Sequence, residues 1–260
     1  MARQRRHKPP RRRRGRFRLF YKFLSILMVT AAVILACVVF FKINSIEVVG
    51  NVRYTAQEIV DASGIQIGDN LMVLPRSRIS AAIRAQLPYV EGVTIQRVPP
   101  DGVVLRVTER VAAASVDSAE GRWLITTQGK LLEPDVGGAR LEVSGLTVLA
   151  PYAGGMVQVA EEDADTLRYV LELLAELEGR GILEQCSALD CSGATSMCLD
   201  YGIYRIKLPR GGDYSYCVSL ALSSLESGLS SGKLQEGQGG TLDLTVTEGK
   251  ALFRPDRSAP

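Results

Sequence analysis

Hydrophobic and polar positions divide the chain into one uninterrupted apolar run and a long region of shorter, periodic patterns. The run covers residues 23–41, FLSILMVTAAVILACVVFF, which contain no charged side chain and lie between Lys22 and Lys42. A helix rises about 1.5 Å per residue, so a run of this length spans the hydrocarbon core of a bilayer. The pattern therefore predicts a transmembrane helix over residues 23–41.

A cleavable signal peptide and a buried core helix are the two alternatives for this run. The apolar part of a signal peptide is shorter, about 7 to 15 residues, and ends at a cleavage site with small residues. Here the run ends with Phe40 and Phe41, which are followed by Lys42. A core helix rarely has an apolar surface on every side. The pattern therefore favours an uncleaved anchor.

After the anchor, the spacing of apolar positions changes between that of strands and that of helices. A short apolar stretch at residues 46–49 predicts a strand, and residues 55–58 (TAQE) have the spacing of a capping box that begins a helix. A second helix is predicted between Pro75 and Pro88, and two strands with alternating apolar positions follow. The order β-α-α-β-β predicts a compact α+β domain over residues 42–114.

Residues 115–254 are predicted to form a second, β-rich α+β domain. Gln128-Gly129 between two apolar stretches indicates a hairpin. A helix is expected from near Glu161 to Gly179, where leucine and valine recur at helical spacing. Further strands are expected over residues 182–189, 198–201 and 204–208, a helix over 214–225 or slightly beyond, and a single terminal strand over 241–253. Residues 255–260 are predicted to be a disordered tail.

Charges are distributed unevenly along the chain. Residues 1–22 contain nine Arg, two Lys and no acid, whereas the rest contains 20 basic and 28 acidic side chains. So basic a segment is predicted to be a disordered tail. Affinity for nucleic acid is one explanation, but no nucleic-acid-binding fold accompanies the tail, which favours the positive-inside rule. We therefore expect residues 1–22 in the cytoplasm and the chain beyond Lys42 outside the membrane.

The cysteines leave the redox chemistry open. Cys37 lies inside the anchor, and Cys186, Cys191, Cys198 and Cys217 lie beyond it. An even number of cysteines outside the cytoplasm is compatible with disulfides. Free buried thiols are the second alternative. A metal site is a third and disfavoured one, because close C-x2-C pairs are missing.

The sequence contains no convincing catalytic or cofactor-binding motif. The only histidine, His7, lies in the basic tail, so no Ser-His-Asp or Cys-His arrangement can form outside. Ser230 and Lys233 match S-x-x-K without its companion motifs, and residues 228–233 fall short of a phosphate-binding loop. The acidic group at residues 161–165 is explained by the start of a helix. The chain is therefore predicted not to be an enzyme and to bind no cofactor or metal.

Four short motifs occur in order along the first predicted domain. They are IEVVGN at residues 46–51, GDNL at 68–71, LPYV at 87–90 and LRVTER at 105–110. Together with the layout of basic tail, single anchor and β-rich second domain, they resemble the POTRA domain and architecture of the FtsQ/DivIB family of bacterial cell-division proteins. Two positions differ from the family, since Val98 stands where members often have Trp, and residues 111–113 lack a proline that they often have.

The resemblance implies a non-enzymatic scaffold at the division septum. It implies binding to small single-pass division proteins of the FtsL and FtsB/DivIC types and, through them, a link to the septal peptidoglycan synthase complex. A different POTRA-bearing module that handles extended polypeptides is one alternative. A membrane-anchored cell-wall enzyme is another, and the missing histidine and motifs disfavour it.

The partner site is expected on the terminal strand. A chain that ends on a strand tends to leave it at a sheet edge, where unpaired backbone groups can accept a partner's strand. The resemblance assigns partner binding to Val246, Glu248, Gly249, Leu252 and Phe253. Leu242 and Leu244 of the same strand are expected to be core residues.

Overall fold

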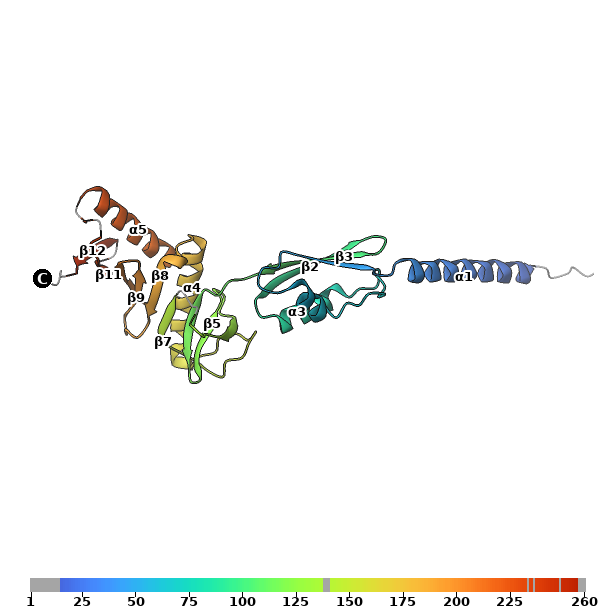
Figure 1. The fold of residues 1–260 in the computed structure, drawn as a ribbon, viewed down its shortest axis with the longest axis horizontal. Coiled ribbons are helices and arrows are strands. Elements are labelled where there is room, and N and C mark those ends of the chain that lie inside the picture. Colours follow the sequence, from blue (N-terminus) through green and yellow to red (C-terminus); the bar gives the residue numbers. More distant parts are fainter. Residues whose placement is uncertain (1–14, 138–140, 233, 236, 248, 257–260) are drawn as a thin grey trace, which may run out of the picture.

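The computed structural model is an elongated molecule with one long helix at one end and the carboxy-terminal strands at the other (Figure 1). It describes residues 15–137, 141–232, 234–235, 237–247 and 249–256. Helix α1 (Gly15–Phe40) is followed by a domain with a three-stranded sheet and then by a domain with a nine-stranded sheet. We call residues 42–110 the proximal domain and residues 114–256 the distal domain.

Helix α1 is the one described helix that is long and apolar enough to cross a membrane, in its segment Phe20–Cys37. None of this segment is buried within the chain, which leaves an apolar surface suited to lipid. The helix begins at Gly15, before the apolar run, because Arg and Lys are good helix formers and do not interrupt it. It therefore extends into the segment expected to be an irregular tail, whose residues 1–14 lie outside the described residues.

The proximal domain has the predicted β-α-α-β-β order. The capping box is present, since Thr55 and Glu58 each accept a hydrogen bond from the other's backbone N–H at the start of the first helix. Ile59, Ile83 and Leu105 join the helices and the sheet in one buried core. The elements are β1 (Ser45–Val49), α2 (Ala56–Ser63), α3 (Arg76–Gln86), β2 (Val90–Val98) and β3 (Gly102–Glu109), with β3 in the middle, parallel to β1 and antiparallel to β2.

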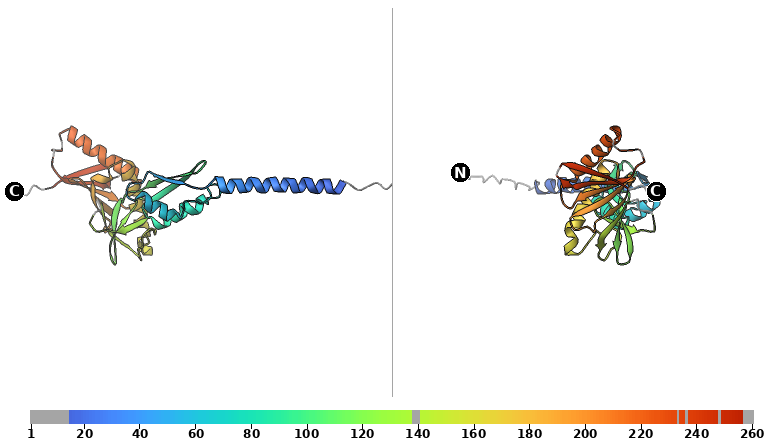
Figure 2. Two further views of the ribbon diagram at one scale, coloured as in Figure 1. Left: turned by 45° about the vertical axis from the view of Figure 1, so that its right-hand side comes forward. Right: turned by 90° about the vertical axis from the view of Figure 1, so that its left-hand side faces the viewer.

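The distal domain is built on one long twisted sheet (Figure 2). Its strands are β4 (Ala114–Ser118), β5 (Gly121–Ile125), β6 (Leu131–Pro134), β7 (Glu142–Val148), β8 (Cys186–Asp190), β9 (Ser196–Tyr201), β10 (Tyr204–Pro209), β11 (Gly240–Thr247) and β12 (Lys250–Pro255). Their order is β12-β11-β10-β9-β8-β7-β4-β5-β6. The helices are η1 (Glu161–Asp163), α4 (Ala164–Gly179), η2 (Leu183–Gln185) and α5 (Tyr214–Ser230). Helices α4 and α5 pack on each other and share the core of the sheet.

One row of apolar side chains crosses the sheet from β7 to its last strand. In register order it consists of Val143, Leu189, Leu199, Ile206, Leu242 and Phe253. All are buried except Phe253, which is partly buried at the sheet edge. Burying one such side chain contributes about 1.5 to 3 kcal/mol to folding. The row therefore ties the terminal strands to the centre of the domain.

The structure corrects one predicted strand. Residues 183–185 were expected within a strand over 182–189 but form the 3-10 turn η2. A hydrogen bond of 3.0 Å from the backbone N–H of Gln185 to the carbonyl of Ile182 closes this turn. Strand β8 therefore begins only at Cys186.

The terminal strand also differs from the prediction. In place of one strand over residues 241–253, the structure has an antiparallel hairpin of β11 and β12. Gly249 makes this possible because its φ of 74° lies in the left-handed region, where a turn reverses the chain. Pro255, expected in the tail, ends β12, and residues 257–260 lie outside the described residues.

The four cysteines beyond α1 are free thiols. Cys186, Cys191 and Cys217 are buried and Cys198 is half-buried. Burial raises the pKa of Cys186 to about 11 and that of Cys191 to about 12. The structure thus agrees with the alternative of buried small apolar residues. Within the described ranges, no group of three or more His, Cys, Asp or Glu side chains is placed to hold a metal ion.

The two domains touch through a small cluster of side chains. Tyr89 of the proximal domain packs against Leu124 and Leu132 of the distal domain. Its hydroxyl donates a hydrogen bond of 2.7 Å to Glu133. Arg53 lies over the Tyr89 ring, 4.0 Å from its centroid, and forms an ion pair with Glu133 at 2.6 Å. These contacts fix the direction of one domain relative to the other.

Candidate partner-binding edge

The distal sheet has two edge strands that are covered differently. Along β6, Leu131 exchanges backbone hydrogen bonds of 2.8 Å with Gly154 and Gly155. Strand β12 pairs with β11 on one side, and no strand of the described chain lies along its other side. Backbone groups on the outer side of an edge strand are available to another chain. The outer edge of β12, at the end of the molecule farthest from α1 (Figure 1), is therefore the candidate site.

Strand β12 is held on the sheet by its inward-facing aromatic residue. Phe253 packs edge to face on Tyr204 of β10, with 6.3 Å between the ring centroids. Gly240 lies against the Phe253 ring, since an added Cβ there would come within 2.5 Å of it. Leu242 and Leu244 of β11 are buried beside this contact, as expected from the sequence. The position of β12 therefore depends on Phe253 and on Gly240, whose lack of a side chain leaves room for the Phe253 ring.

A bulge shapes the end of the hairpin. The register of β11 and β12 shifts between Asp243 and Thr247. Asp243 accepts hydrogen bonds from the backbone N–H of Thr245 at 2.9 Å and from its hydroxyl at 2.6 Å. Burial acts to raise the pKa of Asp243, but these hydrogen bonds and nearby positive charges, Lys207 among them, bring it below its ordinary value. The ionised carboxylate therefore fixes the bulge, which bends the strand beyond it.

The sheet face opposite the core is polar at this end. Asp200, Arg205, Thr241 and Arg254 follow one another in register across β9 to β12. Arg205 donates two hydrogen bonds to Asp200, at 2.7 and 2.9 Å. Leu252 lies on this face too, because side chains alternate along a strand, and it is exposed. An apolar side chain thus stands beside charged ones on the outermost strand.

The five residues predicted to bind a partner lie in different environments. Val246 and Leu252 are 55% and 43% exposed. Gly249 forms the hairpin turn, and Glu248 lies outside the described residues. Phe253 is partly buried and packs on Tyr204, so its side chain helps to hold β12 in place. Among these predicted residues, Val246 and Leu252 have the exposed apolar side chains.

Tyr216 of α5 borders the same hairpin, although no sequence motif marks it. Its side chain is half exposed, and a Cβ added at Gly249 would lie 3.4 Å from its hydroxyl. Asp213 begins α5 by accepting a hydrogen bond of 3.0 Å from the backbone N–H of Tyr216. This N-cap predicts the start of the helix but not the strand beside it. Tyr216 and Gly249 are neighbours only because tertiary packing places α5 beside the hairpin.

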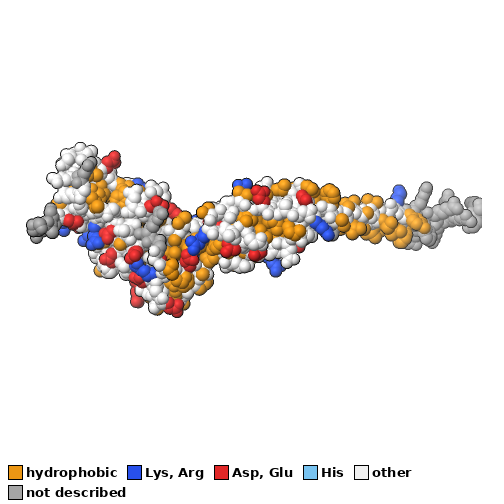
Figure 3. Space-filling model, viewed as in Figure 1, with side chains coloured by type: hydrophobic (Ala, Val, Ile, Leu, Met, Phe, Trp, Pro, Cys, Tyr) orange, Lys and Arg blue, Asp and Glu red, His pale blue; other side chains and the backbone are white. Residues whose placement is uncertain are grey.

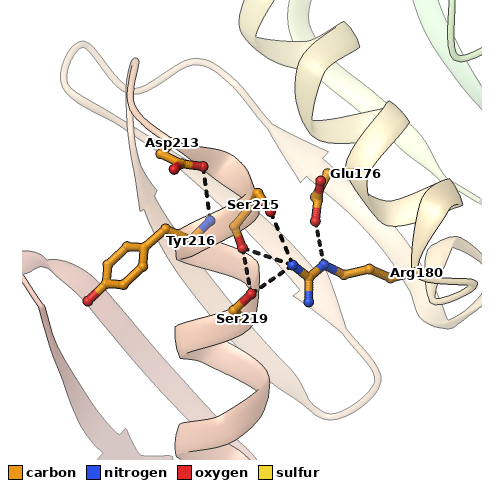
Figure 4. A network of polar contacts seen from close by, with 6 residues as sticks. All are labelled: Glu176, Arg180, Asp213, Ser215, Tyr216 and Ser219. Atoms are coloured by element: carbon orange, nitrogen blue, oxygen red, sulfur yellow. Dashed lines mark hydrogen bonds and ion pairs between the residues drawn. The ribbon is translucent and has the colours of Figure 1, made fainter.

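Polar contacts with α4 fix the start of α5 (Figure 4). Arg180, at the end of α4, donates hydrogen bonds to the carbonyl of Ser215 at 3.0 Å and to the hydroxyl of Ser219 at 2.7 Å. Its position is set by an ion pair with Glu176 at 2.5 Å. Because α5 packs on β11 and β12, this network also helps to position the candidate edge.

The fold and this edge define a class of protein: a chain with one membrane-length helix, a small α+β domain beside it and a β-rich domain that ends in an open-edged strand. Two comparisons with known proteins agree with this class. The family model "POTRA domain, FtsQ-type" matches residues 41–110, which include every element of the proximal domain.

Relatives extend the match into the distal domain. The chain is 32% identical to the cell division protein FtsQ of Corynebacterium glutamicum over 123 residues, 46% of this chain and 54% of the relative. It is 28% identical to FtsQ of Syntrophotalea carbinolica over 165 residues, 62% of this chain and 56% of the relative. It is 30% identical to the cell division protein DivIB of Clostridium acetobutylicum over 110 residues, 42% of each. The chain thus spans about half the length of these relatives, and both comparisons support the FtsQ/DivIB family.

Proposed function

We propose that this chain is a non-enzymatic scaffold of the cell-division machinery. It sits at the division septum, binds small single-pass proteins of the FtsL and FtsB/DivIC types, and links them to the septal peptidoglycan synthase complex. Its relatives are named as cell division proteins, which supports this role. The absence of histidine from the chain beyond His7 supports a binding role over histidine-dependent catalysis.

The open edge of β12 is the observation that carries the proposal. A partner's strand adds alongside β12 and pairs with its outer backbone groups. Backbone pairing supplies affinity, whereas side chains of the edge select the partner. Leu252 and Val246 offer exposed apolar contacts, and Arg254 offers a charge beside them. The partner segment is therefore an extended strand with apolar residues opposite Leu252.

The proposal includes an orientation across the membrane. The amino terminus is cytoplasmic, and residues 43–260 lie outside. The 11 basic residues among residues 1–22 support it, because Lys and Arg beside a span stay on the cytoplasmic side. This orientation places the β12 edge outside the cytoplasm and far from the bilayer.

A binding experiment with the full-length chain tests the proposed edge. The double variant Val246→Lys/Leu252→Lys removes both exposed apolar contacts and places one charge on the edge strand β12 and one on β11 beside it, which oppose strand addition. We expect affinity for an FtsB/DivIC-type partner to fall by about 2 kcal/mol or more, roughly thirtyfold. The control is Val136→Lys, at a fully exposed position away from the edge. Equal affinity of the double variant and the control would exclude β12 as the binding edge.

Phe253→Ala serves as a separate comparison. Its side chain packs on Tyr204 within the distal domain and is only partly exposed at the edge. We therefore expect this variant to loosen β12 as well as to weaken binding. A protease-resistance assay distinguishes the two effects, because Val246→Lys/Leu252→Lys should leave the distal domain as resistant as the unchanged chain.

A further inference from the structure

Large apolar side chains are exposed at the end of the proximal domain that adjoins α1. Ile67, Met72 and Val73, in the loop between α2 and α3, are 64%, 51% and 76% exposed. Val98, at the tip of the β2–β3 hairpin, is also exposed. In Figure 3 the apolar surface of α1 continues onto the adjoining end of this domain. Single exposed apolar residues are common, but a group of them marks an interaction surface.

The loop between α2 and α3 is fastened directly to the end of α1. Backbone hydrogen bonds of 2.8 Å join residues 41–43 to residues 68–71. The Asn70 side chain also donates to the carbonyl of Cys37, inside the last part of α1, at 3.4 Å. Ile43 is fully buried in the core of the proximal domain. No flexible linker therefore separates α1 from this loop.

The hairpin tip is held at the same end. The backbone N–H of Asn44 donates to the carbonyl of Asp101 at 2.9 Å. The guanidinium of Arg97 donates to the carbonyl of Leu74 at 3.0 Å, which joins the hairpin to the loop. Val98 and the loop residues therefore belong to one surface around the exit of the chain from α1.

The depth of this surface follows from the position of α1. Its apolar run ends at Phe41, and Lys42 carries the next charge, so this end of the helix lies where hydrocarbon meets the head groups. Cys37 lies within one helical turn, about 5 Å, of the end of α1. Because Asn70 reaches the carbonyl of Cys37, the loop is held at that depth. Apolar side chains exposed there meet lipid rather than bulk water.

Charged residues around the surface fit this position. Lys42, Arg76 and Arg78 are exposed beside the loop, and such side chains reach lipid phosphates while their stems lie along apolar surface. Asp69 and Asp101 accept hydrogen bonds from within the domain, at 2.9 and 3.1 Å. The basic side chains can therefore face the head groups while both carboxylates keep partners in the protein.

We propose that Ile67, Met72 and Val73, together with the hairpin tip at Val98, insert into the interfacial layer of the lipid leaflet around the end of α1. This rests on α1 spanning the membrane, as in the proposed function, but not on partner binding. A second attachment beside the helix fixes the tilt of the proximal domain on the membrane. Through the contact of Tyr89 with Glu133, it also sets the direction in which the β12 edge is presented.

Tryptophan fluorescence in vesicles tests the insertion. Full-length variants Val73→Trp and Met72→Trp are reconstituted into phosphatidylcholine and phosphatidylglycerol vesicles whose acyl chains are either unmodified or brominated close to the head groups. Bromine quenches tryptophan only at short range. Leu27→Trp, in α1, is the control for the anchor, and Val136→Trp, at a fully exposed distal position, is the control for solvent. The single native tryptophan, Trp123, supplies a background measured in the unchanged chain.

We expect Val73→Trp and Met72→Trp to lose emission in brominated vesicles and to be blue-shifted, as Leu27→Trp is, while Val136→Trp stays at background. Quenching of Leu27→Trp alone would overturn the proposal and leave the anchor intact. A blue shift of both loop variants without bromine quenching would mean that protein covers the loop, and would also overturn it. If Leu27→Trp itself is not quenched, the anchor and the insertion both fail.

Discussion

The hydroxyl of Tyr89 donates a hydrogen bond of 2.7 Å to the carboxylate of Glu133 and so joins the proximal domain to the distal domain. Arg53 contacts both residues, over the ring of one and in an ion pair with the other. Burial and the bond to Glu133 raise the pKa of Tyr89, so its hydroxyl remains a donor at neutral pH. The three side chains form one interdomain contact.

Substitutions at Tyr89 distinguish the contribution of the hydrogen bond in this interdomain contact from the contribution of packing. Tyr89→Phe keeps the ring against Leu124 and Leu132 and should lower the free energy of unfolding by about 1 kcal/mol. Tyr89→Ala also empties the cluster and should cost about 3 kcal/mol. Urea unfolding of the full-length chain in detergent, followed by the fluorescence of Trp123, which packs against the core of the distal domain, measures both. Equal losses would show that the ring contributes no packing energy.

Two glycines with similar backbone angles should respond differently to alanine. Gly145 and Gly154 have φ values of 79° and 83°. A Cβ at Gly145 would lie 2.5 Å from the backbone nitrogen of Ser192, whereas nothing lies within 4 Å of one at Gly154. Gly154→Ala should cost about 1 kcal/mol from backbone strain alone. Gly145→Ala should cost about 3 kcal/mol, since overpacking against backbone adds to the strain. The same unfolding assay compares them, and similar losses would contradict the close packing of β7 on the segment after β8.

Thiol reactivity should report burial rather than disulfides. Burial raises the pKa of Cys186 to about 11 and that of Cys191 to about 12, so little thiolate exists at pH 8. We expect both to resist iodoacetamide in the folded chain and to react fully, without reductant, after denaturation. Mass spectrometry of the alkylated chain measures this. A mass gain that appears only after reduction would show that the thiols are bridged.

The same pKa shifts predict a loss of stability in alkali. A thiol whose pKa is raised by folding stabilises the folded state fully below its ordinary pKa, near 9, and this contribution is lost as the pH rises towards 11 or 12. The free energy of unfolding should therefore decline above about pH 9. Cys191→Ala should flatten this decline, and an unaltered slope in that variant would argue against the shift.

Membrane orientation is tested with one added cysteine. Val136 is fully exposed in the distal domain, so Val136→Cys should react with an impermeant maleimide on intact cells. The unchanged chain, whose cysteines in this domain are buried or half-buried, is the matched control. Labelling of Val136→Cys only after lysis would place the distal domain in the cytoplasm.

Local sequence patterns predicted those elements that depend only on residues close together in the chain. The capping box of Thr55 and Glu58 forms as its spacing indicates, and the apolar run gives the anchor helix. The terminal hairpin was missed because Gly249 is a single glycine within a strand-like stretch, and its turn depends on the bulge that Asp243 fixes. Short-range periodicity contains no information on such a bulge.

Long-range pairing explains what the sequence could not reveal about the candidate site. Phe253 is separated by many residues from Tyr204, and only the parallel pairing of β10 with β11 brings them together. The same pairing decides that Phe253 faces inward and Leu252 outward. The family resemblance pointed to this terminal segment, but which of its side chains are exposed follows only from the register of four strands.

Binding of a partner strand along β12 is tested most directly by site-specific photocrosslinking in dividing cells. A photoreactive amino acid is placed at Leu252 in one full-length chain and at Val136 in another, and the crosslinked products are identified by mass. We predict crosslinks from position 252 to an FtsB/DivIC-type protein and none to it from position 136. If that protein co-purifies with the chain yet never crosslinks at position 252, the β12 edge is not where it binds.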